Sequence, residues 1–210
     1  MHHSTKSIPV QDRAVERVQS ILSAARFLFT EMDVAEVNMA QIAAAAGSKP
    51  AAVYRYFPNK NAIIAELFKQ HCTINNSLIL ATLRSMDSLQ SFPAVGTKVI
   101  RSYAALMQDD PSTRAISFAV RSNVSLRYLE YQNHELLARM IVDVLMGFAP
   151  GATCHDKVQQ QIRVILTSLG PALREGIEAD IGQANEMIAT VCELVEVQTR
   201  HIVATIEGSQ

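Results

Sequence analysis

The fold is decided by Asn38-Met-Ala-Gln-Ile-Ala-Ala-Ala-Ala-Gly-Ser-Lys-Pro-Ala-Ala-Val-Tyr-Arg-Tyr-Phe57, residues 38–57 of the 210-residue chain. This stretch predicts a short helix, a tight turn at Gly47 and a second short helix that ends in an aromatic cluster. Two helices joined by a short turn containing glycine are the sequence form of a DNA-reading helix-turn-helix. The stretch therefore predicts a module that reads DNA, close to the N-terminus.

Local signals support both helices. Asn38 is a good N-cap, because its side-chain oxygen can accept a hydrogen bond from a free backbone N–H. Gly47 supplies the backbone freedom needed after the first helix, and Pro50 suits the first turn of the second. Asn59 is expected to cap the next helix. The first helix presents an apolar stripe at positions i, i+3, i+4 and i+7, formed by Met39, Ile42, Ala43 and Ala46.

The second helix is expected to read DNA. It is about seven residues long, and Val53 and Phe57 lie one turn apart on its buried side. Base-edge contacts concentrate at the start of a recognition helix, where this sequence has Lys49, Pro50 and Ala51. We assign Phe57, Ile42, Ala46 and Gly47 to structure.

The local charge fits this interpretation. The net charge of the chain is −1, which gives no general argument for nucleic acid. From Val37 to Ala65, however, there are bases and no acid, as a phosphate-facing surface requires. Lys60 stands in the first turn of a helix, where a cation is unfavourable for the helix dipole. We therefore expect an external anion, a DNA phosphate, at Lys60.

Composition excludes several other classes of protein. Apolar residues make up 49% of the chain, but no run approaches the roughly 18 residues of a membrane span, and the N-terminus lacks an apolar signal core. Three distant cysteines fit reduced thiols in a cytoplasm. The pairs His71-Cys72 and Cys154-His155 lack metal-finger spacing. There is no glycine-rich phosphate loop and no nucleophile elbow. We expect no metal, no cofactor, no membrane contact and no enzymatic activity.

The rest of the chain predicts an all-α protein. After Asn61 only helical patterns appear, over residues 60–86, 92–108, 112–123, 125–147, 155–179 and 183–206. The last two helices are the most regular, and they form either a core hairpin or half of a four-helix dimer interface. One carries the stripe Ile162, Ile165, Leu166, Leu169, Leu173, and the other the stripe Ala184, Ile188, Val191, Val195, Gln198, Ile202.

A family resemblance rests on a set of short motifs. Ile42-Ala43, Ala46-Gly47, Val53-Tyr54, Tyr56-Phe57 and Lys60 resemble the core signature of TetR-type (tetracycline-repressor-like) transcriptional regulators. The match runs without gaps over roughly residues 13–67. Two positions depart from the family pattern. Ser48 occupies a usually apolar turn position, and Ala51 stands where the family often has glycine, which could alter site preference.

The resemblance implies a three-helix helix-turn-helix head over residues 1–59. It also implies a helical ligand-binding and dimerisation domain over residues 60–210. A homodimer, joined through residues 155–206, would place its two recognition helices in successive major grooves of a palindromic double-stranded operator. We expect a small-molecule effector to release this DNA, as in a repressor, although an activator would share every feature. The predicted DNA contacts are Asn38, Gln41, Lys49, Pro50, Ala51, Tyr54, Arg55, Tyr56 and Lys60, with Arg17 a further candidate.

Two alternatives stay open at this stage. The motif could be a relic in a helical dimerisation protein that acts through protein contacts alone, which predicts no salt-dependent DNA binding. The ligand site is also weakly specified, since methionine and aromatic residues at helical spacing occur in ordinary cores as well. Helical bundles place ligands between their central helices. The candidate ligand-binding residues there are Tyr103, Met107, Phe118, Arg121, Asn123, His134, Met140 and Phe148.

Overall fold

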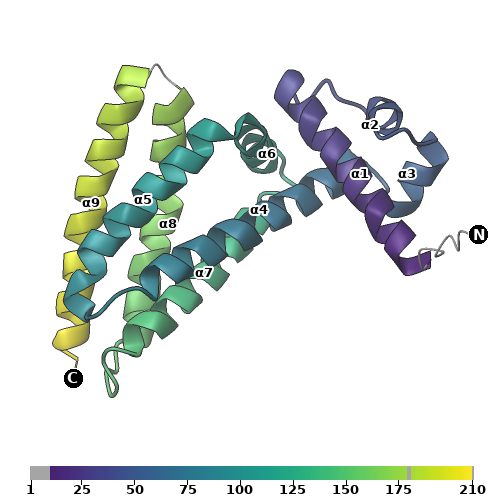
Figure 1. The fold of residues 1–210 in the computed structure, drawn as a ribbon. Coiled ribbons are helices and arrows are strands. Elements are labelled where there is room, and N and C mark those ends of the chain that lie inside the picture. Colours follow the sequence, from purple (N-terminus) through teal and green to yellow (C-terminus); the bar gives the residue numbers. More distant parts are fainter. Residues whose placement is uncertain (1–9, 179–180, 210) are drawn as a thin grey trace, which may run out of the picture.

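The structure is a computed structural model that describes residues 10–178 and 181–209, and the regular elements in these ranges are all helical. Three helices form the N-terminal head: α1 (Val10–Glu31), α2 (Met39–Ala45) and α3 (Pro50–Tyr56). Helix α4 (Lys60–Leu83) leads from the head into the second part of the molecule (Figure 1). The remaining elements are the 3-10 turn η1 (Leu89–Ser91), α5 (Phe92–Asp109), α6 (Pro111–Ser122), α7 (Tyr128–Met146), α8 (His155–Glu178) and α9 (Ile181–Glu207). The expected all-α class is confirmed.

Side-chain caps set the ends of the short head helices. The Asn38 side chain accepts hydrogen bonds from the backbone N–H groups of Ala40 and Gln41, both at 3.0 Å. The Gln41 side chain accepts one in return from the Asn38 N–H, at 2.8 Å, which completes a capping box. Gly47 follows α2 with φ +58°, in the left-handed region that favours glycine. The predicted N-cap, turn and Pro50 start are therefore confirmed.

One apolar core joins the head to the helices beyond it. Its buried members on α1, α2 and α3 include Ile21, Ile42 and Val53. The same cluster continues through Leu67 on α4 to Ile116 on α6. The expected division between residues 59 and 60 thus falls at the start of a helix that contributes to both parts.

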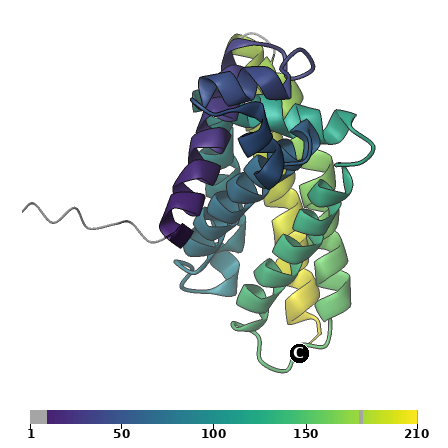
Figure 2. The ribbon, with the colours of Figure 1, turned by 90° about the vertical axis from the view of Figure 1, so that its right-hand side faces the viewer.

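The second part of the molecule is a helical bundle. Helices α5, α8 and α9 lie side by side, and α7 packs beside α8 and α4 (Figures 1 and 2). The apolar residues of the α8 and α9 stripes face into the protomer, with Ile162, Leu173, Val191 and Ile202 all buried, whereas Gln198, predicted on the α9 stripe, is exposed. These stripes form the core hairpin, so a dimer must use other faces of the two helices.

Two helix ends differ by three residues from the sequence-based expectation, and the other ends beyond residue 60 by at most two. Helix α4 ends at Leu83 and not at residue 86, because the chain turns through Ser85 and Met86 with hydrogen bonds to Thr82 and Leu83. Helix α7 begins at Tyr128, since Asn123 accepts a hydrogen bond from the Ser125 N–H and holds a turn before it. No helix within residues 10–178 and 181–209 is long and apolar enough to cross a bilayer.

Candidate nucleic-acid interface and ligand cavity

Helix α3 presents its polar side to solvent. Val53 and Phe57 are buried in the head core, whereas Lys49, Pro50, Ala51, Tyr54 and Arg55 are exposed. Tyr54 is 51% exposed, a large fraction for an aromatic side chain that has core residues beside it. The side chain of Lys49, the residue before the helix, makes no hydrogen bond or ion pair within the part of the chain described. The start of α3 is therefore free to contact another molecule.

Arg55 and Tyr56 form a pair at the other end of α3. The Arg55 guanidinium donates a hydrogen bond to the Tyr56 hydroxyl at 2.9 Å and lies 4.9 Å from the ring centroid. Tyr56 is partly buried against the head core. The pair brings a cation and a phenol hydroxyl together beside the helix, an arrangement that can hold a phosphate.

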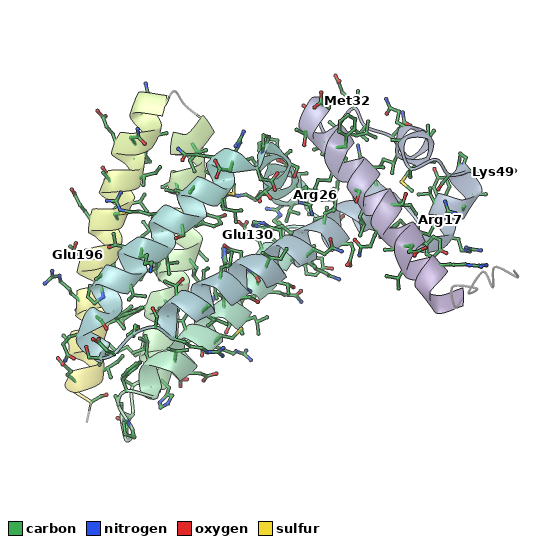
Figure 3. The ribbon with its side chains drawn as sticks, viewed as in Figure 1. Arg17, Arg26, Met32, Lys49, Glu130 and Glu196 are labelled. Carbon is green, nitrogen blue, oxygen red and sulfur yellow. The ribbon has the colours of Figure 1, made fainter. Side chains whose placement is uncertain are left out.

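Arg17 reaches the same region from α1. Its Nη1 donates a hydrogen bond to the Ser48 hydroxyl at 3.0 Å, and that hydroxyl lies 3.2 Å from the Ala46 carbonyl oxygen, to which it donates. Figure 3 places Arg17 and Lys49 at the same end of the head. Ser48, the departure from the family pattern in the turn, thus positions a second cation near the start of α3.

Lys60 has partners inside the protein. Its ammonium group donates to the carbonyl oxygens of Val34, Ala35 and Val37 at 2.6, 3.0 and 2.7 Å. Three acceptors use all three N–H donors of a lysine. Burial lowers the pKa of Lys60, and the nearby Asp33 opposes that effect. The structure therefore explains this cation without an external anion, which corrects the reason given for a phosphate contact.

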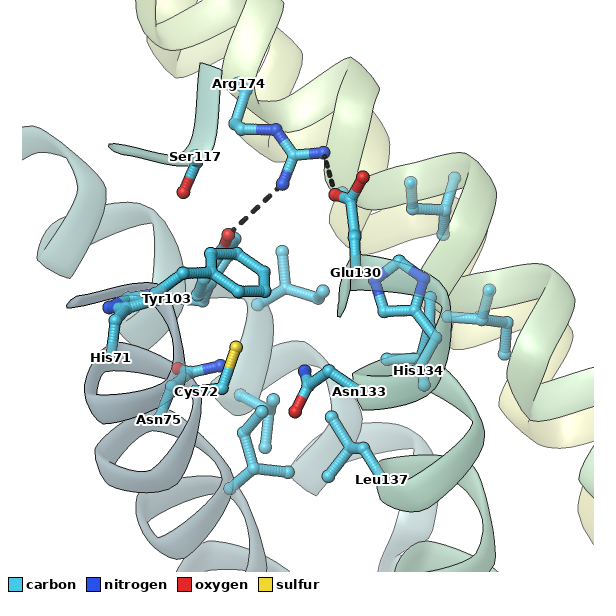
Figure 4. A pocket seen from close by; sticks show the side chains of 18 residues that line it. His71, Cys72, Asn75, Tyr103, Ser117, Glu130, Asn133, His134, Leu137 and Arg174 are labelled. Atoms are coloured by element: carbon cyan, nitrogen blue, oxygen red, sulfur yellow. Dashed lines mark hydrogen bonds and ion pairs between the residues drawn. The ribbon is translucent and has the colours of Figure 1, made fainter. Parts of the chain in front are cut away.

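A cavity lies in the second part of the molecule, between α4, α5, α6, α7 and α8 (Figure 4). Its volume is about 100 Å³. One end has polar side chains, and the other is aliphatic. Among its lining residues are His71, Tyr103, Ser117, Glu130, His134 and Arg174.

A buried ion pair marks the polar end of this cavity. Nη2 of Arg174, a residue that is 9% exposed, lies 3.1 Å from a Glu130 carboxylate oxygen. Arg174 Nη1 lies 3.4 Å from the Tyr103 hydroxyl, to which it donates. The other Glu130 oxygen lies 3.6 Å from Nε of Arg121. Two guanidinium groups thus share one carboxylate.

Burial shifts the pKa values of groups around the cavity. It lowers the pKa of His71 and of His134, although nearby carboxylates oppose the shift. Both imidazoles are therefore neutral near pH 7. Burial, with the Glu130 carboxylate nearby, raises the pKa of the Cys72 thiol to about 12. Burial also raises the pKa of Tyr103, whose hydroxyl stays protonated and can donate a hydrogen bond.

The cavity contains only part of the predicted ligand set. Tyr103 and His134 line it. Arg121 does not line the cavity, but its guanidinium group pairs with Glu130, which does. The other five do not line this cavity. Met107 is fully buried in the core, and Met140 packs against the bundle core around Ile141 and Ile202. Phe118 and Phe148 are exposed, and the Asn123 side chain donates a hydrogen bond to Asn61. Periodicity alone does not separate cavity walls from core.

Sequence reasoning missed Arg174, Glu130 and His71. Arg174 had a usable signal, because it extends the face of α8 that carries Leu166 and Gly170, at intervals of four residues. A charged residue on an otherwise apolar helix face needs a buried partner. Within residues 10–178 and 181–209 no group of three or more potential metal ligands gathers.

Comparisons with known proteins place these features in context. Residues 21–67 match the family described as bacterial regulatory proteins, tetR family, and residues 90–197 match the family described as tetracyclin repressor-like, C-terminal domain. The sequence matches no curated protein.

Solved structures with similar folds include a TetR-family transcriptional regulator from Streptomyces coelicolor. It is 17% identical, with a TM-score of 0.69, and the alignment covers 90% of this chain and 98% of that one. FadR, a fatty acid degradation regulator from Bacillus halodurans, is 17% identical, with a TM-score of 0.59 and coverage of 95% and 97%. RolR, in complex with resorcinol, is 15% identical, with a TM-score of 0.63 and coverage of 92% and 95%. At these identities the likeness shows a shared fold.

Proposed function

Since the chain belongs to the TetR family of DNA-binding transcriptional regulators, we propose that it is a cytoplasmic repressor that binds a palindromic operator as a homodimer and is released by a small molecule. The observation that carries this proposal is the exposed start of α3 on a rigidly capped helix-turn-helix. A recognition helix contacts base edges with its N-terminal residues, and here the Lys49 side chain has no hydrogen-bond or ion-pair partner within the described chain.

We assign the DNA contacts by where the side chains lie. Lys49, Pro50 and Ala51 would face base edges, while Tyr54, Arg55 and Tyr56 would bind the phosphate backbone. Arg17, held by Ser48, would add a phosphate contact. Asn38 and Gln41 remain candidates, with side chains already engaged in the capping box. To Lys60 we assign the support of the loop before α2, because its donors are used there.

Dimerisation is proposed through the outer faces of α8 and α9. Their inner stripes are buried in the protomer, yet Val164, Leu194 and Val197 are 56%, 48% and 63% exposed. Apolar side chains left exposed on long helices favour an interface between copies. A Val197→Glu, Leu194→Glu variant should sediment as a folded monomer.

Release from DNA is proposed to work by linkage. A ligand in the cavity would favour a head spacing that fits DNA poorly, and operator affinity would fall by the ratio of the ligand affinities in the two states. A coupling of about 1–3 kcal/mol changes affinity roughly 5- to 150-fold. RolR has been crystallised with the small ligand resorcinol. We propose that this chain likewise binds a small ligand, in the cavity described above.

Selection from a random duplex library with the purified protein tests the proposal. We expect an enriched palindrome whose half-sites lie about 34–36 Å apart or somewhat more. Lys49→Ala should relax preference at one base position, and Lys98→Ala on α5 serves as the matched control. Folded, dimeric protein that enriches no sequence would contradict specific DNA binding and favour a role through protein contacts.

A further inference from the structure

We propose that the effector is a slender carboxylate, whose carboxylate group binds at Arg174 and whose alkyl chain fills an aliphatic chamber beside it. The proposal rests on the proposed function, because it names the ligand class of the same cavity. It is carried by the hydrogen-bond donors that lack acceptors at one end of the cavity, the excess of positive charge just behind that end, and the purely apolar chamber next to the cavity.

Hydrogen-bond donors at the polar end lack acceptors within residues 10–178 and 181–209, and Arg174 Nε is fully buried among them. Arg174 gives one hydrogen bond to Glu130 and one to Tyr103, while its Nε is buried without a partner among the described residues. The Tyr103 hydroxyl accepts from Arg174 and donates no hydrogen bond to any residue that the structure describes. The buried Ser117 hydroxyl also donates no hydrogen bond within the part of the chain described. Unused buried donors are costly, and a ligand rich in acceptor oxygens would satisfy them.

The charge at this end is positive. The Glu130 carboxylate faces the guanidinium groups of both Arg174 and Arg121. Burial lowers the pKa values of His71 and His134, so neither imidazole adds charge near pH 7. One carboxylate therefore serves two guanidinium groups, of which Arg174 is buried at the cavity and Arg121 has a side chain that is 35% exposed. A ligand carrying one negative charge restores the balance.

Other charged groups just outside the cavity occur with a group of opposite charge, so they do not change its net charge. Arg26 pairs with Asp110 at 3.7 Å, so together they contribute no net charge. A hollow on the outer side of Arg174 is also lined by Arg114 and Glu175, which are opposite in charge. Arg121 lines this outer hollow and not the cavity, so the positive charge that Glu130 leaves unbalanced lies just behind the polar end.

The opposite end lies beside an aliphatic chamber. This second cavity of about 70 Å³ lies between α4, α5, α7, α8 and α9 and presents only apolar atoms. It shares a wall with the first cavity, formed by Ile79, Val99, Ile100, Ile165 and Leu166. An apolar cavity of about 150 Å³ accommodates benzene. Once a ligand displaces the aliphatic side chains of this wall, the two spaces together would fit a carboxylate with a chain of roughly six to eight carbons.

Gly96 shapes the far end of the chamber. A Cβ at this position would lie 3.2 Å from Val195 Cγ1 and 3.3 Å from Thr199 Cγ2, so glycine allows α5 to approach α9 closely. The closed end sets an upper limit on chain length. Each methylene that enters before this limit should tighten binding about threefold to fourfold.

Titration calorimetry with the purified full-length chain tests the class of ligand. The probes are butanoate, hexanoate, octanoate and dodecanoate, with 1-octanol and octylamine as charge controls. We expect affinity to rise from butanoate to octanoate and to fall at dodecanoate. Octanol should bind about tenfold more weakly than octanoate or worse, and octylamine should not bind. Octanol or octylamine binding as tightly as octanoate, or the absence of carboxylate binding, would overturn the proposal.

Two variants test the role of Arg174. Arg174→Gln should weaken octanoate binding about tenfold or more and leave octanol binding unchanged. Glu130→Gln removes the competing carboxylate and should tighten octanoate binding. A purely structural role for the pair would weaken both ligands equally in both variants. Arg163→Gln, which breaks an ion pair with Glu135 outside the cavity, is the matched control, and Glu130→Gln keeps the test decisive if Arg174→Gln does not fold.

Operator affinity measured in the same samples separates the two proposals. Saturating octanoate should weaken operator binding roughly 5- to 150-fold. An operator affinity unchanged by bound octanoate would overturn the effector assignment, although the DNA-binding function would stand. Failure to select any operator would instead contradict the proposed function, and the calorimetric result would still decide the carboxylate site.

Discussion

Arg26 on α1 and Asp110 at the start of α6 lie 3.7 Å apart, and their ion pair links the helix-turn-helix head to a helix that lines the cavity. Asp110 also caps α6, since it accepts hydrogen bonds from the backbone N–H groups of Ser112 and Thr113. Burial alone would raise the pKa of Asp110, but hydrogen bonds from Ser112 and Thr113 outweigh it and hold the pKa below its ordinary value. This carboxylate therefore supports both the helix and its contact with the head.

Substitutions at these two positions should differ in their effect on stability. Arg26→Gln removes a partly exposed ion pair and should lower the free energy of unfolding by less than about 1 kcal/mol. Asp110→Ala also removes the N-cap of α6 and should cost about 1–2 kcal/mol. Urea unfolding of both variants measures the difference. Equal losses would show that the cap contributes nothing beyond the ion pair.

Gly47 should tolerate asparagine better than alanine. Its φ is +58°, where a Cβ is strained, although no atom lies within 4 Å of the added carbon. Gly47→Ala should therefore lower the free energy of unfolding by about 1–2 kcal/mol through backbone strain. Gly47→Asn is the matched control and should lose less, because asparagine visits the left-handed region more readily. A neutral Gly47→Ala in thermal unfolding would show that the turn relaxes.

Lys60 should contribute to the stability of the fold and not to the electrostatic attraction between the protein and DNA. Lys60→Met removes three hydrogen bonds from an ammonium group to backbone carbonyls and should lower stability by about 1–3 kcal/mol. The slope of log affinity against log salt should stay the same. A slope reduced by about one unit in a variant of unchanged stability would restore the phosphate contact.

The two cavity histidines should make stability depend on pH. Burial lowers the pKa of each in the folded state below the ordinary 6.5. At a pH between the folded and unfolded pKa values, the unfolded chain binds more protons than the folded chain. The free energy of unfolding is therefore highest above about pH 6.5 and falls as the pH drops through the folded pKa values. The slope is at most about 1.4 kcal/mol per pH unit for each histidine.

Urea unfolding between pH 5 and 8 measures this effect. The double variant His71→Gln, His134→Gln should lose most of the dependence between pH 5 and 6.5. The carboxylates whose pKa values are lowered, Asp87 and Asp110, act below that range. An unchanged pH profile in the double variant would assign the dependence to other groups.

The head could be predicted closely from the sequence because its signals are local. The Asn38 cap, the Gly47 turn and the Pro50 start each act within four residues of their own position, and each lies where it was expected. The partners of Lys60 lie 23 to 26 residues earlier in the chain. Its dipole environment indicated that a partner was needed, but only the tertiary structure shows which one.

The cavity could be predicted only in outline. Its central ion pair joins residues 44 positions apart, and the Arg174–Tyr103 hydrogen bond spans 71. Helical periodicity gives the face of each helix but not which faces meet around a space. Of the residues predicted by side-chain type, Tyr103 and His134 line the cavity, whereas Met107 is buried in the core.

The most direct test of the central claim is the affinity of the purified protein for its selected palindrome. Fluorescence anisotropy at near-physiological salt compares this duplex with one of the same composition in which both half-sites are scrambled. The account predicts binding at least about a thousandfold tighter to the palindrome, with most of the preference lost in a Lys49→Ala, Tyr54→Ala variant that remains folded and dimeric. Equal affinity for the two duplexes would contradict the assignment of α3 as a sequence-reading helix.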